Sequence, residues 1–463
     1  MEGIRQAVRE PISPIQSKVL WACIGTVLAF SVALAITEGT WIDSMLVLFA
    51  PLAVYLSLQR PFIFPVGFYV FSIPFENLLV MSGAQHGATV TRLLGAIAIA
   101  ALAVKGMFEG KLRTPEKINL WWALFAFYCL LSMTWAISGR LSLVRAQTII
   151  GLAGLYIVLS MYRVEKKEYE SLMWFILAGG ALASIFTIYA YHENLLDFGN
   201  AARVSLISLD SSKGVSGANK QAFDMLLPVS VCLGMLLKKG RPLVRAFFFL
   251  VLFMMFYGIV ITGSRGGLAA VLAILIFFLL SARSRLKAAI IAAVTVAATL
   301  PMTSGFFLDR IRNSVSSHAS GRTDIWHVGL KAMGKYWLFG AGLDCFPKAY
   351  TEFVRYSQVY MGLDRAPHNI FVGMFVELGI IGGLLMVVAM VRHYAAIGRL
   401  AGKFETDRIV LKAAFWAILV GGLSQDVVWY KSFWLLWMMI VIQKHVSEAG
   451  GDRLGPPGTG RAD

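Results

Sequence analysis

Arg265 and His368 are the residues whose types and positions best suit chemistry in this sequence. Arg265 is a permanent cation at the start of an apolar run, between Ser264 and Gly266. There a guanidinium and the free N–H groups of a helix start could bind a phosphate, or the arginine could anchor the helix to lipid headgroups. His368 directly precedes the apolar run that begins at Asn369. It is therefore a candidate proton acceptor or, alternatively, a solvated capping residue.

Three apolar runs begin with polar, turn-forming residues, at 216–219, 263–267 and 367–369. The side-chain oxygens of Ser264 and Asn369 can accept hydrogen bonds from the first helical turn, so both residues are expected N-caps. The positive dipole end of each helix favours a bound phosphate. Ser264, Gly266, Asn369 and Asn219, which lie at these starts, are predicted to contact the substrate, and so is Arg203 in the polar segment before the first of them.

Charged residues inside apolar runs need a partner or a polar cavity. Glu377 lies nine residues beyond His368. On a helix it would be ~13 Å deeper and on nearly the opposite face, so no contact between the two is expected. Arg145 lies one turn inside its run and is a further predicted substrate contact. Asp426 and Lys431 flank a short turn and are expected to pair.

The elements that must position these residues are apolar. The chain has 463 residues, of which 58% are hydrophobic and 15% charged, and its mean hydropathy is +0.69. Soluble domains average about 45–50% apolar and about 25% charged residues, so the composition excludes a water-soluble enzyme, a disordered protein and a nucleic-acid-binding domain. It predicts an all-α, polytopic transmembrane bundle. About fourteen spans are expected, with twelve as the alternative count, at 19–37, 44–58, 61–81, 90–104, 118–137, 141–161, 170–191, 220–237, 244–262, 265–281, 287–304, 369–391, 409–427 and 431–445.

The distribution of charge predicts the orientation. The chain carries 42 Lys and Arg against 26 Asp and Glu, and basic residues gather on cytoplasmic loops. The basic residues favour cytoplasmic termini, with the loops 192–219 and 305–367 outside. The predicted organisation is a cytoplasmic segment at 1–18, transmembrane helices at 19–304, a long periplasmic loop at 305–367, transmembrane helices at 368–445 and a disordered cytoplasmic tail at 446–463.

The 305–367 segment is too long for a simple connector. From Arg322 to position 339, its apolar and aromatic residues recur at helical intervals, and Trp326 and Trp337 suit a membrane interface. We expect a lid-like amphipathic helix over a lipid-facing cavity. The alternative is a helix that only caps the bundle.

Motifs for metals and nucleotides are absent from the sequence. It contains no Asp-X-Asp, no His and Cys cluster with metal-ligand spacing and no phosphate-binding Gly-x4-Gly-Lys-Ser/Thr loop. Catalysis by a divalent metal and hydrolysis of a nucleotide are therefore disfavoured, and no cofactor is expected.

Four motifs resemble those of the superfamily of O-antigen ligases and O-antigen polymerases (Wzy). They are Thr262-Gly-Ser-Arg-Gly-Gly267, Ser320-Gly-Arg-Thr-Asp-Ile-Trp326, His368-Asn-Ile-Phe-Val-Gly-Met-Phe-Val-Glu-Leu-Gly379 and Lys431-Ser-Phe-Trp434. Their order, their spacing and their position on one predicted membrane face carry the resemblance, which covers about residues 215–440.

The resemblance implies a metal-independent, GT-C-like glycosyltransferase of the bacterial inner membrane, with Arg265, Arg322 and His368 as its essential residues. The donor would be an oligosaccharide on undecaprenyl pyrophosphate at the periplasmic face. The acceptor would be a sugar hydroxyl of another lipid-linked repeat unit (polymerase) or of lipid A–core (ligase). Attack opposite the leaving group would invert the anomeric centre.

Polymerase is slightly favoured over ligase, because fourteen spans and a cytoplasmic C-terminus resemble polymerases more. A chain-length regulator is then a candidate partner, besides membrane lipid. A protein O-oligosaccharyltransferase would share the chemistry and differ in its acceptor. A transporter or flippase of lipid-linked sugars is the alternative from another class, but it should carry its charges near mid-membrane in broken helices.

Overall fold

The computed structural model describes residues 51–76, 78–79, 89–193, 217–238, 240–281, 293, 297, 321–360, 362–398, 400 and 404–451. Within these residues the chain is helical and has no strand, and Leu112 and Tyr162 form an isolated bridge. The predicted all-α class is therefore confirmed for this part of the chain. The expected span at 19–37 and nearly all of that at 287–304 lie outside the described residues.

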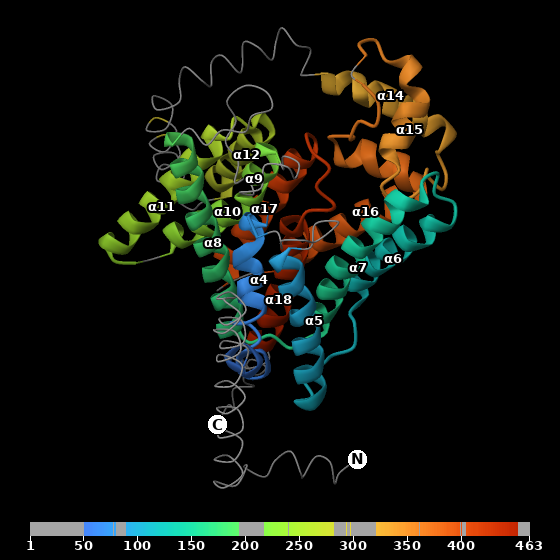
Figure 1. Ribbon diagram of the computed structural model, residues 1–463. Helices are drawn as coiled ribbons and strands as arrows, with labels where there is room; N and C mark the ends of the chain where they lie inside the picture. Colours follow the sequence, from blue (N-terminus) through green and yellow to red (C-terminus); the bar gives the residue numbers. More distant parts are fainter. Residues whose placement is uncertain are drawn as a thin grey trace, which may run out of the picture.

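The bundle is built from helices that follow the predicted apolar runs (Figure 1). They are α4 (Val66–Ser72), α5 (Val90–Phe108), α6 (Lys117–Leu131), α7 (Gly139–Met161), α8 (Lys166–His192), α9 (Ala218–Asp224), α10 (Leu226–Leu237), α11 (Pro242–Ile261), α12 (Arg265–Ser281), α16 (Ile370–Gly398), α17 (Glu405–Gly422) and α18 (Lys431–Gly451). Short 3₁₀ turns follow α4 and α6, namely η1 (Ile73–Phe75) and η2 (Ser132–Thr134).

Six helices are long and apolar enough to cross a membrane: α5, α7, α8, the α9–α10 pair, α11 and α16. The apolar segments Val66–Phe75 and α12 are shorter. In the first of these, the α-helix ends at Ser72, and Pro74 soon after it has no N–H with which to continue the backbone hydrogen-bond ladder. The described part of the chain is thus that of a membrane protein with several spans, and the predicted number of fourteen is not confirmed.

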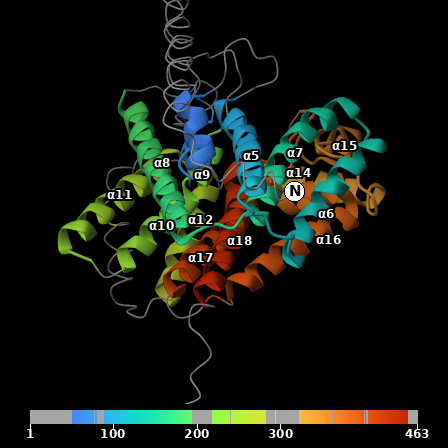
Figure 2. The ribbon, with the colours of Figure 1, turned by 90° about the horizontal axis from the view of Figure 1, so that it is seen from below.

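Helix α18 lies at the centre of the bundle in both views (Figures 1 and 2). Its residues are apolar on all sides from Phe433 to Ile442, and all of these are buried. Such a helix is stable only with neighbours around its whole circumference. The indoles of Trp434 and Trp437 pack on Trp122 of α6, with ring centroids 5.1 and 5.3 Å apart.

Hydrogen bonds between helix ends define one end of the bundle, which we call the site end. The Asn369 amide donates to the carbonyl of Leu423 at 3.2 Å, which joins the start of α16 to the end of α17. The Gln425 amide donates to the carbonyl of Asn219 at 2.9 Å, which joins the α17–α18 connection to the start of α9. The starts of α9, α16 and α18 therefore lie at the same end.

The opposite end, which we call the far end, is joined by other side chains. His445, near the end of α18, contacts the Glu116 carboxylate before α6 at 2.8 Å. The Gln443 amide donates to Asp407, near the start of α17, at 2.9 Å. Neighbouring helices thus alternate in direction between two polar ends, as expected for a polytopic bundle.

A small helical layer lies over the start of α16, at the upper right of Figure 1. It consists of α14 (Arg322–Lys335), α15 (Phe346–Phe353) and the 3₁₀ turn η4 (Val354–Tyr356). The predicted amphipathic helix is therefore confirmed, although it ends at Lys335. This layer has an apolar core of its own, made of Ile325, Val328, Ala332, Ala341, Cys345, Phe346, Ala349, Tyr350 and Val376.

A kink in α16 attaches this layer to the bundle. Gly379 has a φ of 62°, which interrupts the helix. The carbonyls of Val376 and Glu377 are then free to accept hydrogen bonds from Ala341 and Gly342, at 2.9 and 2.8 Å. The loop between α14 and α15 is thereby tied to the backbone of α16.

Several helix ends differ from the predictions; α16, for example, continues to Gly398 rather than 391, and α6 ends at Leu131 rather than 137. Helix α18 continues to Gly451, so the first residues of the predicted disordered tail at 446–463 are helical. An ion pair between Lys444 and Glu448, at 3.0 Å and one turn apart, stabilises these last turns, which apolar content alone does not reveal. Helix α17 ends at Gly422 rather than at 427, before a polar connection.

Candidate functional site

Helix α12 begins at Arg265, directly after a tight turn. Gly263 in this turn has a φ of 61°, a conformation that glycine adopts at little cost. The hydroxyl of Ser264 accepts a hydrogen bond from the third N–H of the helix at 3.2 Å, so the predicted N-cap is confirmed. A Cβ on Gly266 would collide with the hydroxyl of Ser424. The start of α12 therefore packs directly against the α17–α18 connection, and the expected contact of Gly266 with substrate stays a prediction.

Helix α14 begins at Arg322, after Gly321, which has a φ of 72°. The Arg322 guanidinium is half-buried. Its pKa is lowered by burial and by the charge of Arg265, against a smaller opposite effect of Tyr430. No carboxylate of the described part of the chain is among these influences. Two arginines from different helix starts thus lie within electrostatic range of each other.

His368 lies between two anchored residues. The carbonyl of Pro367 accepts a hydrogen bond from the Trp326 indole at 3.0 Å. The Asn369 side chain accepts hydrogen bonds from the first turn of α16 at 2.9 and 3.1 Å, so it is the predicted N-cap. His368 itself has a φ of 47°, uncommon for a residue other than glycine. Such a backbone persists only where its surroundings hold it, and it is frequent at functional sites.

The pKa of His368 shows that it lies near Arg322. Burial, the charge of Arg322 and the charge of Arg365 lower this pKa to about 4. The imidazole is therefore uncharged at neutral pH. Arg322 therefore lies within electrostatic range of both Arg265 and His368. We call these three residues, at the starts of α12 and α14 and directly before α16, the cationic cluster, after its two arginines.

Arg145 and Glu377 each have a partner, as the sequence predicts. Arg145 forms an ion pair with Asp344 at 2.8 Å and lies over the Trp429 ring, 5.0 Å from its centroid. The Glu377 carboxylate accepts hydrogen bonds from the backbone N–H groups of Asp344 and Phe346, at 3.0 and 3.4 Å. Both charges thus hold the loop between α14 and α15, and a contact of Arg145 with substrate stays a prediction.

The predicted pair of Asp426 and Lys431 is wrong. Lys431 forms an ion pair with Glu76, which also pairs with Lys220 at 3.3 Å. Asp426 instead accepts a hydrogen bond from the Trp429 indole at 3.0 Å. The physical reason is that Lys431 is the first residue of α18, whose first turn faces η1 and α9, whereas Asp426 remains in the connection before it.

Asn219 lies in the first turn of α9, where its carbonyl binds Gln425. The Tyr430 hydroxyl donates to the same Gln425 at 3.1 Å, and the Lys220 ammonium lies over the Tyr430 ring at 5.5 Å. These contacts connect α9 to the α17–α18 connection. The expected contact of Asn219 with substrate stays a prediction, and Arg203 lies outside the described residues.

Sequence reasoning missed Asp426 as a site residue. One of its carboxylate oxygens is buried and has no hydrogen-bond partner in the described part of the chain. Burial and the charge of Asp344 raise its pKa to about 7, although Arg145 opposes this rise. The signal was the polar run Ser424-Gln425-Asp426 inside the expected span at 409–427, which marks a connection rather than helix.

The arrangement is suited to an anion beside a neutral imidazole. Two guanidiniums offer planar pairs of donors that match phosphate oxygens without a metal. The N-termini of α12 and α14 add positive dipole ends to the same region. A hydroxyl brought next to His368 could lose its proton to the uncharged ring.

Comparison with protein families agrees with this geometry. Residues 250–387 match a family model described as O-antigen ligase. The matched segment is less than half of the chain, and it contains α12, the α14–α15 layer and the first part of α16. All three residues of the cationic cluster therefore lie inside it. No curated protein matches the chain.

Proposed function

Residues 250–387 belong to the O-antigen ligase and polymerase superfamily, and from this premise we propose that the chain is a membrane glycosyltransferase that acts on lipid-linked glycans. The gathering of Arg265, Arg322 and His368 at one end of the bundle carries the proposal. These residues lie at or directly before helix starts and not at mid-helix, where a transporter would carry its charges. The enzyme is therefore favoured over the flippase alternative.

The donor in this proposal is an oligosaccharide on undecaprenyl pyrophosphate. When the anomeric C–O bond breaks, its electron pair passes to the pyrophosphate, whose negative charge grows in the transition state. Arg265 and Arg322 would bind its oxygens, and fixed donors aimed at developing charge commonly contribute a few kcal/mol each. The charge on the pyrophosphate is larger in the transition state than in the bound donor. Two fixed guanidiniums therefore stabilise the transition state more than the bound donor, and this difference accelerates the chemical step.

His368 would take the proton of the acceptor hydroxyl while that oxygen attacks the anomeric carbon. Attack from the face opposite the pyrophosphate inverts the anomeric centre. With a pKa of about 4, the free imidazole is a weak base. A bound pyrophosphate would offset the charge of Arg322 and raise this pKa, because a nearby anion favours the protonated imidazolium. The base would therefore be strongest when the donor is in place.

The acceptor is a sugar hydroxyl, either on another lipid-linked repeat unit or on lipid A–core. The predicted count of fourteen spans favours polymerase, whereas the description of the matching family model favours ligase. Deletion of the protein, followed by electrophoresis of cell-surface glycans, separates the two. Loss of long chains with one repeat unit left on the core indicates a polymerase, and a bare core with intact lipid-linked polymer indicates a ligase.

The site end would face the periplasm across the bacterial inner membrane, since the charge pattern assigns the loops 192–219 and 305–367 to the outside. The α14–α15 layer would then form the lid over the bound lipid-linked donor. Its fixed attachment to the α16 kink supports a layer that stays near the cationic cluster.

Substitution in cells tests the proposal. Arg265→Ala and Arg322→Ala should each abolish polysaccharide output while membrane insertion and protein amount stay normal. Arg355→Ala is the matched control, because this arginine belongs to the same layer, is exposed and lies against Tyr356. Normal output from either cluster variant would refute the assignment. Purified activity should also persist in EDTA, and a strict need for Mg²⁺ or Mn²⁺ would overturn the metal-free mechanism.

A further inference from the structure

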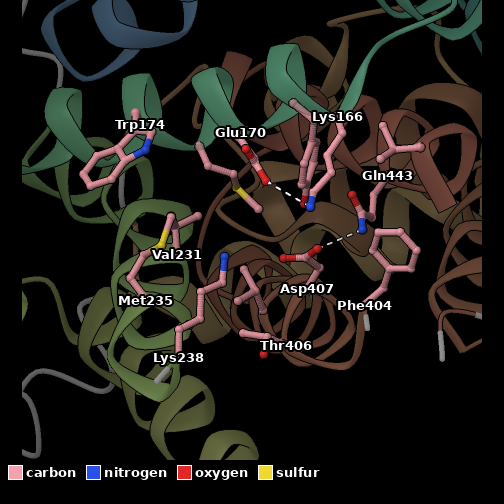
Figure 3. Close-up of a pocket in the computed structure, with 15 residues that line it drawn as sticks. Lys166, Glu170, Trp174, Val231, Met235, Lys238, Phe404, Thr406, Asp407 and Gln443 are labelled. Carbon is pink, nitrogen blue, oxygen red and sulfur yellow. Dashed lines mark hydrogen bonds and ion pairs between the residues drawn. The ribbon is translucent and has the colours of Figure 1, made fainter. Parts of the chain in front are cut away.

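A cavity of about 410 Å³ opens at the far end of the bundle, between α8, α10, α17 and α18 (Figure 3). This volume lies within the range of ~300–1,000 Å³ that is usual for small-molecule sites. Gln443, which lines the cavity, is twelve residues along α18 from Lys431 at the site end, about 18 Å at 1.5 Å per residue. The cavity is therefore separate from the cationic cluster.

Two lysines and two carboxylates line this cavity, and Figure 3 shows them around one central space. Lys166 and Glu170 approach each other to 3.5 Å on α8. Lys238, at the end of α10, lies across from Asp407 of α17, whose carboxylate accepts a hydrogen bond from Gln443 at 2.9 Å. The polar lining thus has two positive and two negative side chains, and each side of the cavity carries one of each sign or faces one.

Two buried polar atoms at the cavity have no hydrogen-bond partner in the described part of the chain. They are the Tyr169 hydroxyl and the Gln443 side-chain oxygen, on residues that are 3% and 0% exposed. Buried polar groups are nearly always hydrogen-bonded. An occupant of the cavity with polar groups of its own would satisfy them, which an apolar molecule could not do.

The remaining wall of the cavity is apolar. Trp174, Val231 and Met235 form this side, and the Trp174 indole is 51% exposed on α8. Helix α8 and the α9–α10 pair are both among the apolar segments long enough to cross a membrane. Tryptophan is enriched where such helices leave the hydrocarbon. The open side of the cavity therefore faces the depth at which lipid headgroups lie.

We propose that this cavity binds the headgroup of a phospholipid that carries a primary ammonium, as in phosphatidylethanolamine. The phosphate contacts Lys166 and Lys238, the ammonium donates to Asp407 and the Gln443 oxygen, and the acyl chains leave past Trp174. A headgroup with one phosphate and one ammonium matches the lysines and carboxylates of the cavity in charge. A purely anionic headgroup would face two carboxylates, and a choline headgroup has no N–H to donate.

The test uses the purified full-length protein, delipidated in a neutral detergent. Lipid binding is measured as the rise in the thermal unfolding midpoint of the protein. The probes are short-chain phosphatidylethanolamine, phosphatidylglycerol and phosphatidylcholine with the same acyl chains, and free phosphoethanolamine. Phosphatidylethanolamine should raise the midpoint in a saturable way and bind at least about tenfold tighter than the other two lipids, a difference of about 1.4 kcal/mol. If free phosphoethanolamine gives the same affinity, the headgroup alone is the ligand and the lipid assignment is wrong.

Lys238→Gln and Asp407→Asn should each weaken phosphatidylethanolamine binding about tenfold or more. Lys167→Gln is the matched control, because this exposed lysine neighbours Lys166 but does not line the cavity. Equal binding of all three lipids, or equal affinity in the control and cavity variants, would contradict the proposal. The readout is independent of glycan transfer, so its failure leaves the proposed enzyme function untouched.

Discussion

At the scale of residues, Arg145 and Arg322 differ in the charges that surround them. Arg145 is neutralised by Asp344, at 2.8 Å. The pKa of Arg322, by contrast, is lowered by the positive charge of Arg265, which repels it. No carboxylate of the described chain is among the charges that affect this pKa. Two cations held near each other raise the free energy of the empty site, and an anion between them removes that cost. This difference supports the proposal that Arg322 binds an anionic ligand, whereas Arg145 holds the fold together.

Arg322→Lys tests whether the shape of the guanidinium matters besides its charge. Lysine keeps the charge but loses the planar pair of donors that binds two phosphate oxygens. Loss of one hydrogen bond to a charged group costs about 1.5–3 kcal/mol, so we expect transfer by the purified enzyme to fall roughly ten- to hundredfold. Arg355→Lys serves as the control and should retain normal rates. Full activity of Arg322→Lys would show that a point charge suffices.

The pKa of His368 predicts an unusual pH dependence. With a pKa of about 4, the ring stays neutral and reactive toward diethyl pyrocarbonate well below pH 6.5. Arg322→Gln removes a nearby cation, so the protonated ring becomes more stable and the midpoint of reactivity should shift to higher pH. Mass spectrometry of the modified His368 peptide across pH measures this. A wild-type midpoint near pH 6.5 that Arg322→Gln does not move would count against the cluster.

At the scale of elements, glycines with positive φ determine where the α14–α15 layer lies. Gly379 in α16 and Gly340 in the loop between α14 and α15 have φ values of 62° and 83°. A Cβ on either would collide with the backbone of the other segment. The layer is therefore attached to the bundle by close backbone contact rather than by side chains alone.

Gly379→Ala should lower the thermal unfolding midpoint of the purified protein and reduce glycan transfer, because alanine disfavours positive φ and collides with the carbonyl of Leu338. Gly398→Ala is the matched control on the same helix. No atom lies closer than 4.0 Å to a Cβ there, and no positive φ is needed. This control should be neutral, or stabilising by about 0.5–1 kcal/mol. Equal midpoints for the two variants would show that the kink does not depend on glycine.

The sequence predicted most helices of the described chain, because long apolar runs have few alternatives to helix in a membrane. It also predicted the caps at Ser264 and Asn369, which depend only on residues next to them in the chain. Prediction from the sequence failed for contacts between residues that are far apart in the chain. The pairing of Lys431 with Glu76 joins residues 355 positions apart, and no local pattern reveals it. For the same reason Asp426 was missed, since its burial depends on neighbours that only the packed bundle supplies.

At the scale of the whole molecule, the two polar ends of the bundle should face opposite sides of the membrane. The site end carries the cationic cluster, and the far end carries the cavity of about 410 Å³. The described native cysteines, Cys129, Cys232 and Cys345, are all buried. New cysteines in a background without native cysteine can therefore report each end separately.

In spheroplasts, Gln358→Cys at the site end should react with a membrane-impermeant maleimide, because it is exposed after η4. Lys167→Cys at the far end is equally exposed and should react only after the membrane is permeabilised. Mass shifts on gels measure both reactions. The reverse pattern would turn the site end toward the cytoplasm and end the periplasmic assignment.

The most direct test of the central claim is a double-mutant cycle for binding of undecaprenyl pyrophosphate to the purified protein in EDTA. If Arg265 and Arg322 grip the same diphosphate, Arg265→Gln and Arg322→Gln should each weaken binding, and the double variant should lose less than the sum of the two losses. Undecaprenyl monophosphate should bind more weakly and show a smaller coupling. Strictly additive losses, or wild-type affinity in either single variant, would contradict a shared diphosphate site.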